Sequence, residues 1–305
     1  METNKKKKLV AKLSIFSNVL LTTLKIIAGV ISGSISIISE AIHSLSDLFA
    51  SVLTFFSVVK SSEPADADHP YGHGKYEDMA GFIEGILIIL ASFFIIFESA
   101  KKIILFTTNE ATTNLGIIVM AVAVVLNSFV SYLLLKVAKE TNSVSLYADG
   151  EHLRTDIYSS LGVFIGLILI KVTGYAVLDP IIAILIAGLI YKTGYTISKK
   201  SWMRLMDHSL PVEEIENIKN IITHYECQTE LKEYSIKARQ TGPFKDIDLI
   251  LQFPGETSIC ECHKICDEIE EEIQKVYTNS SISIHLEPIC YGKNCKELCT
   301  NKKGG

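Results

Sequence analysis

The stretch GIIVMAVAVVLNSFVSYLLL, residues 116–135, is twenty residues long and contains no charged side chain. A helix of this length spans the hydrocarbon core of a bilayer, which is about 30 Å thick, because each helical residue rises about 1.5 Å. Lys136 and Lys139 follow the stretch directly. It therefore predicts a membrane-spanning helix and indicates that the chain is a membrane protein.

Five other segments also have the length and apolar content of a spanning helix, and all of them end before residue 200. The second and fifth spans are the least apolar. The six predicted spans cover residues 9–31, 35–59, 79–105, 114–138, 145–171 and 177–199. The first span is too long for a signal-peptide core and no small-residue cleavage site follows it, so we expect it to be retained.

Lysine and arginine lie mostly at the span ends that share a side with the N-terminus. Lys101, Lys102 and Lys171 weaken this bias without reversing it. Positively charged loops stay in the cytosol, and an even number of spans returns the chain to the same side. The sequence therefore predicts a multi-pass protein of the cell membrane with both termini in the cytosol.

Composition excludes several classes of protein. The net charge of −5 disfavours a nucleic-acid partner, because such domains are strongly basic. The seven cysteines all follow the last predicted span, and an odd number in one region is not typical of a secreted disulfide framework. No Walker A loop is present, so the sequence gives no indication of ATP-driven chemistry.

Beyond Trp202 the pattern changes from apolar spans to amphipathic elements. The elements are expected in the order α-β-β-α-β, as a small α+β domain with one sheet backed by helices. The predicted elements are a helix over 211–225, strands over 231–239 and 246–253, a helix over 256–277 and a strand over 280–288. We thus expect a six-helix all-α transmembrane domain (1–207), a cytosolic α+β domain (208–289) and a flexible, cysteine-bearing tail (290–305).

The pattern H-x-x-x-D occurs in both of the least apolar spans, as His43/Asp47 and as His152/Asp156. Residues four apart share one face of a helix, so each helix offers an imidazole beside a carboxylate. Two nitrogens and two oxygens form a tetrahedral set that suits Zn²⁺, and two aspartates balance its charge at membrane depth. An isolated histidine in a span is often only a packing residue, but the repeated spacing favours a metal site.

An imidazole binds either a proton or a metal ion, so the same set indicates coupling of outward metal flow to inward proton flow. One alternative is a membrane sensor or scaffold that binds metal without transporting it. A complete ligand set inside the bilayer favours transport over sensing. A metalloenzyme is disfavoured, since four protein ligands leave no open position for water and no general base is added.

Together these motifs resemble the cation diffusion facilitator family of metal/proton antiporters. The resemblance lies in SGSISIISEAIHSLSD (32–47), EPADADHPYGHGKYED (63–78), YADGEHLRTD (147–156), LDP (178–180) and MDHSLP (206–211). It implies a homodimer in the lipid bilayer, a ferredoxin-like, metallochaperone-like cytosolic domain, and a transport site at His43, Asp47, His152 and Asp156. Histidine at the first position favours zinc over manganese, with Cd²⁺, Co²⁺, Fe²⁺ and Ni²⁺ also possible.

The resemblance also implies a metal site in the loop after the second span, formed by Asp66, His69 and His73, with Asp68 as a possible further ligand. A solvated acidic loop is the alternative interpretation. In the family, a lysine at the position of Lys75 pairs with the acidic residue of MDHSLP, here Asp207, across the dimer.

A third set, His263, His285 and Glu287, matches part of the family's cytosolic metal site. Tyr234 and Ile250 occupy positions where relatives have histidines, so a two-metal centre is not expected and a single ion or plain surface histidines remain open. Cys262 and Cys266 fall on the apolar stripe of the predicted helix and are expected in the core. The tail cysteines Cys290, Cys295 and Cys299 could bind soft metals or stay free.

Overall fold

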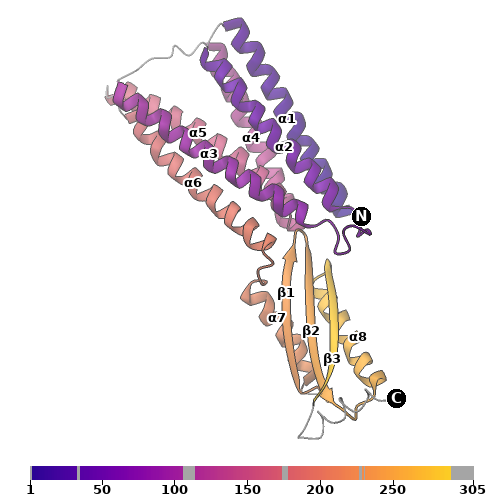
Figure 1. Ribbon diagram of the computed structural model, residues 1–305. Helices are drawn as coiled ribbons and strands as arrows, with labels where there is room; N and C mark the ends of the chain where they lie inside the picture. Colours follow the sequence, from indigo (N-terminus) through magenta and orange to yellow (C-terminus); the bar gives the residue numbers. More distant parts are fainter. Residues whose placement is uncertain are drawn as a thin grey trace. The chain divides into compact units, whose positions relative to one another are not determined.

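The computed structural model of the protein describes residues 2–32, 35–105, 114–173, 178–226, 229 and 231–289. The chain divides into two compact units, Met1–Met206 and Asp207–Gly305. In the described residues, the regular elements of the first unit are all helices, and the second unit combines helices with a sheet (Figure 1). The predicted fold class is confirmed, whereas the tail lies outside the described residues.

All six helices predicted for the first unit are present. They are α1 (Glu2–Ser32), α2 (Ile35–Ser61), α3 (Lys75–Leu105), α4 (Asn114–Thr141), α5 (Val144–Thr173) and α6 (Leu178–Leu205). The main difference is in α1, which begins at Glu2 rather than near residue 9. The lysine run at the N-terminus is therefore helical, and Lys7 is buried rather than simply one of the inner-side charges.

Three of these helices, judged on the described residues, are long and apolar enough to cross a membrane. The qualifying segments are Asn4–Ala28, Lys75–Lys101 and Ala121–Thr141. The total of six spans and the cytosolic position of both termini stay predictions.

Large apolar side chains lie on the surface of the helical unit, and many polar side chains are buried inside it beside two apolar clusters. Phe16, Phe56 and Phe94 are 67%, 63% and 66% exposed, whereas Asn18 and Glu84 are 3% and 0% exposed. In water this distribution would be costly, but lipid is as apolar as these rings. The exposed apolar surface therefore suits a lipid environment, and the helices enclose buried polar groups.

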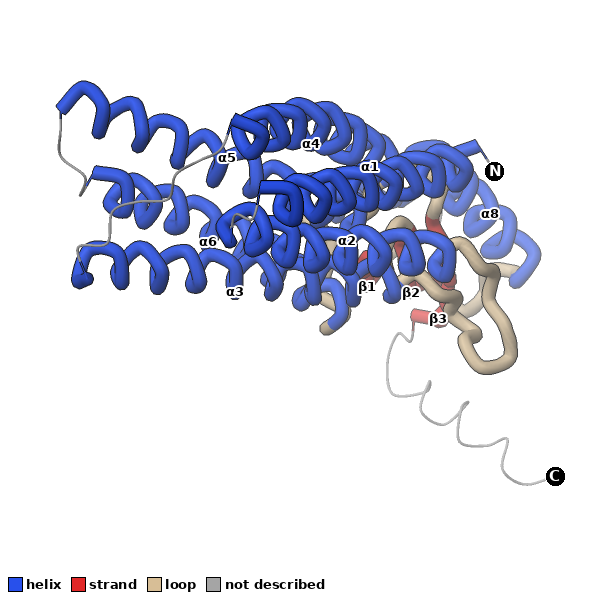
Figure 2. Tube along the Cα trace, turned by 90° about the horizontal axis from the view of Figure 1, so that it is seen from above, coloured by secondary structure: helices blue, strands red, loops and turns tan. Residues whose placement is uncertain are grey.

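Close approach of α3 and α6, which lie side by side in Figures 1 and 2, depends on glycine. A β-carbon on Gly85 would lie 2.8 Å from the backbone nitrogen of Ser198, and one on Gly194 would lie 2.9 Å from the Gly85 carbonyl oxygen. Small residues at helix contacts allow this proximity inside a membrane.

The second unit has the predicted order α-β-β-α-β. Its elements are α7 (Val212–Glu226), β1 (Glu233–Thr241), β2 (Phe244–Pro254), α8 (Ile259–Val276) and β3 (Ser280–Ile289). The sheet order is β1-β2-β3, with β1 antiparallel and β3 parallel to β2. Helix α8 is the crossover that a parallel pair requires.

One face of the sheet and the two helices enclose the core of this unit. Every second residue of β2, including Ile247 and Leu249, is buried against Ile218 of α7 and Ile269 of α8. Cys266, like Cys262, is 6% exposed within the same cluster. The prediction that these two cysteines belong to the core is confirmed.

Candidate metal centres

The structure brings Asp47 of α2 together with His152 and Asp156 of α5. His152 Nε2 lies 3.2 Å from Asp47 Oδ1, and one ligating atom from each of the three residues lies within 4.8 Å of the others. Asp47 and His152 are buried and Asp156 is half-buried. His43 belongs to α2, but its side chain lies outside the described residues, so its part in the set stays a prediction.

Neighbouring polar groups hold this cluster in place. Thr155 Oγ1 donates to the His152 carbonyl at 2.7 Å, and Asn18 of α1 donates to the Asp47 carbonyl at 3.4 Å. His152 Nδ1 is buried and accepts or donates no hydrogen bond in the described part of the chain. The imidazole of His152, which has one nitrogen without a hydrogen bond, and the two carboxylates together form a donor set. This set suits a divalent transition metal.

A second cluster forms in the loop between α2 and α3. Asp66, His69 and His73 each offer a ligating atom within 4.8 Å of the others. His69 Nδ1 lies 3.2 Å from Asp66 Oδ1, and His73 Nε2 lies 3.4 Å from Asp66 Oδ2. Asp66 and His69 are exposed, whereas His73 is buried in the loop two residues before α3.

The backbone of this loop orders the carboxylate of Asp66 before any ion arrives. Asp66 Oδ1 accepts backbone N–H bonds from His69 at 2.7 Å and from Asp68 at 3.0 Å. The bond from the His69 backbone is the main reason why the pKa of Asp66 is lowered. Gly72 has φ of +82°, in the left-handed region that favours glycine. Asp68 contributes its backbone and is not one of the three clustered ligands.

The third predicted set is not assembled within one chain. His285 and Glu287 alternate with the core residues of β3 and so lie on the face of the sheet that α7 and α8 leave open, while His263 lies on α8. No group of three clustered ligands in the described residues includes any of them. Metal binding by this set stays a prediction.

The two positions where histidines are missing lie on opposite faces of the sheet. Ile250 pairs in register with His285 on the open face, whereas Tyr234 packs on the core and its hydroxyl lies 3.2 Å from Thr223 Oγ1. Histidines at these two positions of one chain would therefore point to opposite sides of the sheet and could not bind the same metal ion.

Asp207 and Arg154 both lie at the surface with ionic partners. Asp207 Oδ2 lies 3.4 Å from Arg239 of the same unit. Its pairing with Lys75 of a second copy stays a prediction. Arg154 is exposed and bonds Glu151 at 2.8 Å, away from the His152 cluster.

Sequence reasoning gave no site role to a set of acids in the helical unit that are all fully buried: Glu77, Asp78, Glu84 and Asp149. A signal for one of them was available. Asp149 is three residues before His152 and seven before Asp156, which is the spacing of a single helix face.

Comparison with known families agrees with this architecture. The model of the cation efflux transmembrane domain matches residues 11–206, and that of the cytoplasmic domain of cation efflux proteins matches residues 210–289. The chain belongs to the cation diffusion facilitator family. As a cation diffusion facilitator it is a membrane protein of a cation-transporting family, which agrees with its apolar outer surface.

Similar members include proteins named for cations in general and proteins named for manganese. An uncharacterised transporter of Synechocystis sp. is 32% identical, with 92% of this chain and 89% of the relative aligned. The cation-efflux pump FieF of Shewanella oneidensis is 29% identical over 92% of this chain and 94% of the pump. The manganese efflux system protein MneP of Bacillus subtilis is 29% identical over 92% of this chain and 95% of that protein.

Proposed function

We propose that this cation diffusion facilitator exports divalent transition-metal cations, zinc before others, in exchange for protons, and that it is not an enzyme. The observation that carries the proposal is the buried cluster of Asp47, His152 and Asp156. Two carboxylates neutralise a divalent ion where an uncompensated charge is expensive. His43, one turn from Asp47, is proposed as the fourth ligand.

The imidazole of His152 supports the choice of metal. Nitrogen ligands suit Zn²⁺, Cd²⁺, Co²⁺ and Fe²⁺, whereas an all-oxygen set suits Mn²⁺ better. Relatives named for manganese efflux make the metal a question for experiment rather than for family membership.

Proton exchange follows from the same ligands, because His152 releases its proton to bind metal and takes one up when the metal leaves. We further propose six spans in the cell membrane, both termini in the cytosol, and a homodimer held in part by the cytoplasmic domain. The loop cluster of Asp66, His69 and His73 is proposed as a second cytosolic metal site, ordered before binding by its backbone.

Zinc uptake into inverted membrane vesicles tests the proposal. We expect Asp47→Asn and His152→Ala each to reduce the initial rate at least tenfold, since each removes one of four ligands. Asp248→Asn, an isosteric change at an exposed position of β2, serves as the matched control and should transport normally. Normal rates in both cluster variants would refute the site.

Two further arms address the metal and the coupling. Competition with Mn²⁺, Fe²⁺, Co²⁺ and Cd²⁺ ranks the ions, and zinc should compete best. In proteoliposomes, an imposed pH gradient should change the zinc flux severalfold. A flux that ignores the gradient would reject proton exchange while leaving the metal site intact.

A further inference from the structure

One face of α2 presents a polar residue at nearly every turn. Asp47, Ser51, Thr54 and Ser61 are separated by four, three and seven residues, which places them on a single side of the helix. All four are buried. At about 1.5 Å per residue, Thr54 lies about 10 Å and Ser61 about 21 Å from Asp47, toward the end of the bundle at the 62–74 loop.

Each hydroxyl on this face donates to a different buried carboxylate. Ser51 donates to Asp149 Oδ1 of α5 at 3.0 Å. Thr54 donates to Glu84 of α3, and Ser61 donates to Glu77 of α3 at 2.8 Å. Acids therefore line a route from the Asp47 cluster to the loop end of the bundle.

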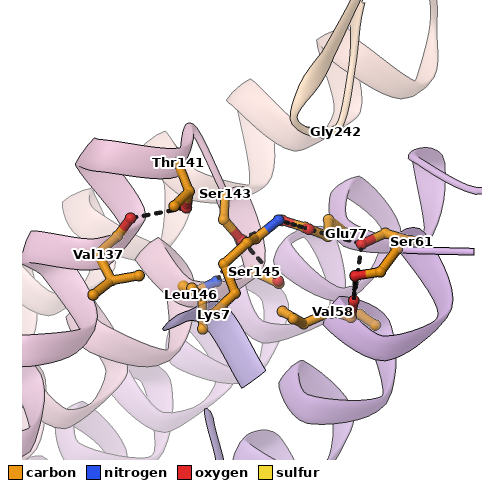
Figure 3. A network of polar contacts seen from close by, with 12 residues as sticks. Lys7, Val58, Ser61, Glu77, Val137, Thr141, Ser143, Ser145, Leu146 and Gly242 are labelled. Atoms are coloured by element: carbon orange, nitrogen blue, oxygen red, sulfur yellow. Dashed lines mark hydrogen bonds and ion pairs between the residues drawn. The ribbon is translucent and has the colours of Figure 1, made fainter. Parts of the chain in front are cut away.

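The last acid on this route is neutralised by protein. Glu77 forms an ion pair with Lys7 of α1, and the hydroxyls of Ser61 and Ser143 donate to the same carboxylate (Figure 3). Its neighbour Asp78 lies 3.6 Å from Arg204. Each of these two acids is thus already paired with a lysine or arginine of the chain and needs no bound cation to balance its charge.

Asp149 and Glu84, which we call the inner carboxylate pair, are different. Both are fully buried, and within the described ranges neither forms an ion pair with a lysine or arginine. Asp149 Oδ2 and Glu84 Oε2 also have no hydrogen-bond partner there. Each therefore has one satisfied oxygen and one buried oxygen without a partner.

Burying such a group is expensive unless something compensates it. A buried polar atom without a hydrogen bond costs about 1–3 kcal/mol, and an unpaired ionised carboxylate costs considerably more. Two buried carboxylates of this kind, bonded to hydroxyls one turn apart on α2 and next to a cluster that suits a divalent cation, are hard to explain as packing.

We propose that Asp149 and Glu84 form a second divalent-cation site in the helical unit, between the Asp47 cluster and the loop end. Their unpartnered oxygens are the ligands, and Ser51 and Thr54 orient the carboxylates. This inference rests on the proposed function in one respect, namely that a cation travels to or from the Asp47 cluster along α2.

The chemistry of the pair defines its role. Oxygen ligands bind a borderline ion such as Zn²⁺ less tightly than a set with imidazole, so an ion here passes readily to His152. Oxygen ligands also accept Mn²⁺, so the pair discriminates little between metals. Selectivity therefore belongs to the histidine-containing cluster, and the pair determines how fast any ion reaches it.

Equilibrium dialysis of radioactive zinc against the full-length chain in detergent micelles tests this assignment. The Asp47→Asn variant serves as background, because it disables the first cluster while leaving the pair intact. Adding Glu84→Gln or Asp149→Asn should weaken one class of the remaining zinc binding at least tenfold. Adding Glu84→Asp, which keeps the charge, should restore it to within about threefold.

Glu98→Gln is the matched control, since Glu98 is a half-buried glutamate of the same helix and pairs with Lys101. It should leave zinc binding unchanged. Manganese dialysis should show the same loss on Glu84→Gln as zinc does. Identical binding by the Asp47→Asn background with and without both neutralising changes would overturn the proposal.

Failure of the proposed function gives a separate result. Normal vesicle uptake by Asp47→Asn would reject the first cluster, whatever the dialysis shows for the inner carboxylate pair. In an otherwise wild-type chain, Glu84→Gln should slow uptake of zinc and manganese by similar factors of about ten. A change of metal preference instead of a common slowing would contradict the role given to the pair.

Discussion

The buried ion pair between Lys7 and Glu77 makes a quantitative prediction about the stability of the helical unit. The two side chains are 1% and 0% exposed, and the pair joins the second turn of α1 to the first turn of α3. Changing Lys7 to Met keeps the length of the side chain and removes its charge. Glu77 would then keep two hydroxyl donors but no cation.

Removing one member of a buried pair costs about 3–5 kcal/mol, because the remaining charge is left uncompensated. Glu77→Gln in the same background removes that charge, and its amide oxygen still accepts from Ser61. The double variant should therefore lose only about 1 kcal/mol relative to wild type, the value of a typical hydrogen bond. The double variant should thus be about 2–4 kcal/mol more stable than the Lys7→Met variant, and the effects of the two single changes should not be additive.

Equilibrium unfolding in mixed micelles of increasing SDS content measures these differences for wild type, both single variants and the double variant. The exposed pair Lys60/Glu63 provides a matched control with the same residue types. Its Met and Gln variants should not measurably change the midpoint, because exposed pairs contribute little. Additive effects of the Lys7 and Glu77 changes would show that the contact does not hold the helices together.

Three further predictions concern other parts of the chain. Gly85→Ala should destabilise the helical unit by about 1–3 kcal/mol despite the better helix propensity of alanine, because the new β-carbon meets the Ser198 backbone. Unfolding in SDS tests this, and increased stability of the variant would contradict it. Burial raises the pKa of the Cys266 thiol to about 11, so at pH 8 only about one such thiol in a thousand is ionised. Cys260 is exposed, and mass spectrometry should therefore find it alkylated long before Cys266. Ser258→Ala removes the capping box of α8 and should cost about 1 kcal/mol, seen as roughly fivefold faster hydrogen exchange in its first turn; unchanged exchange would argue against the cap.

Periodicity predicted the elements of this fold because each one expresses its pattern locally. The apolar run at 116–135 lies within α4, and the alternation in 246–253 lies within β2. The start of α1 was placed too late, since lysines are not apolar and a hydropathy pattern ends where they begin. The helix continues there because Lys7 has a buried partner seventy residues away.

The candidate site likewise has one part that the sequence predicts and one part that it does not. The spacing of His152 and Asp156 is local and could be read directly, and their contact with Asp47 followed from the second copy of the pattern. The inner carboxylate pair could not be predicted, because Asp149 and Glu84 come from different helices and meet α2 through serine and threonine. A hydroxyl in an apolar span is too common to indicate a partner.

The polar residues of the second predicted span can now be explained by geometry. In α2 the polar residues Asp47, Ser51 and Thr54 are buried, while Phe49 and Phe56 on the remaining surface are 60% and 63% exposed. A sum over the sequence averages these two faces and makes the helix resemble a poor span. A lipid-facing surface needs only the exposed face to be apolar, and an ion pathway needs only the buried face to be polar. A span that carries charged and polar residues on one face is thus the one expected to line the route of the cation.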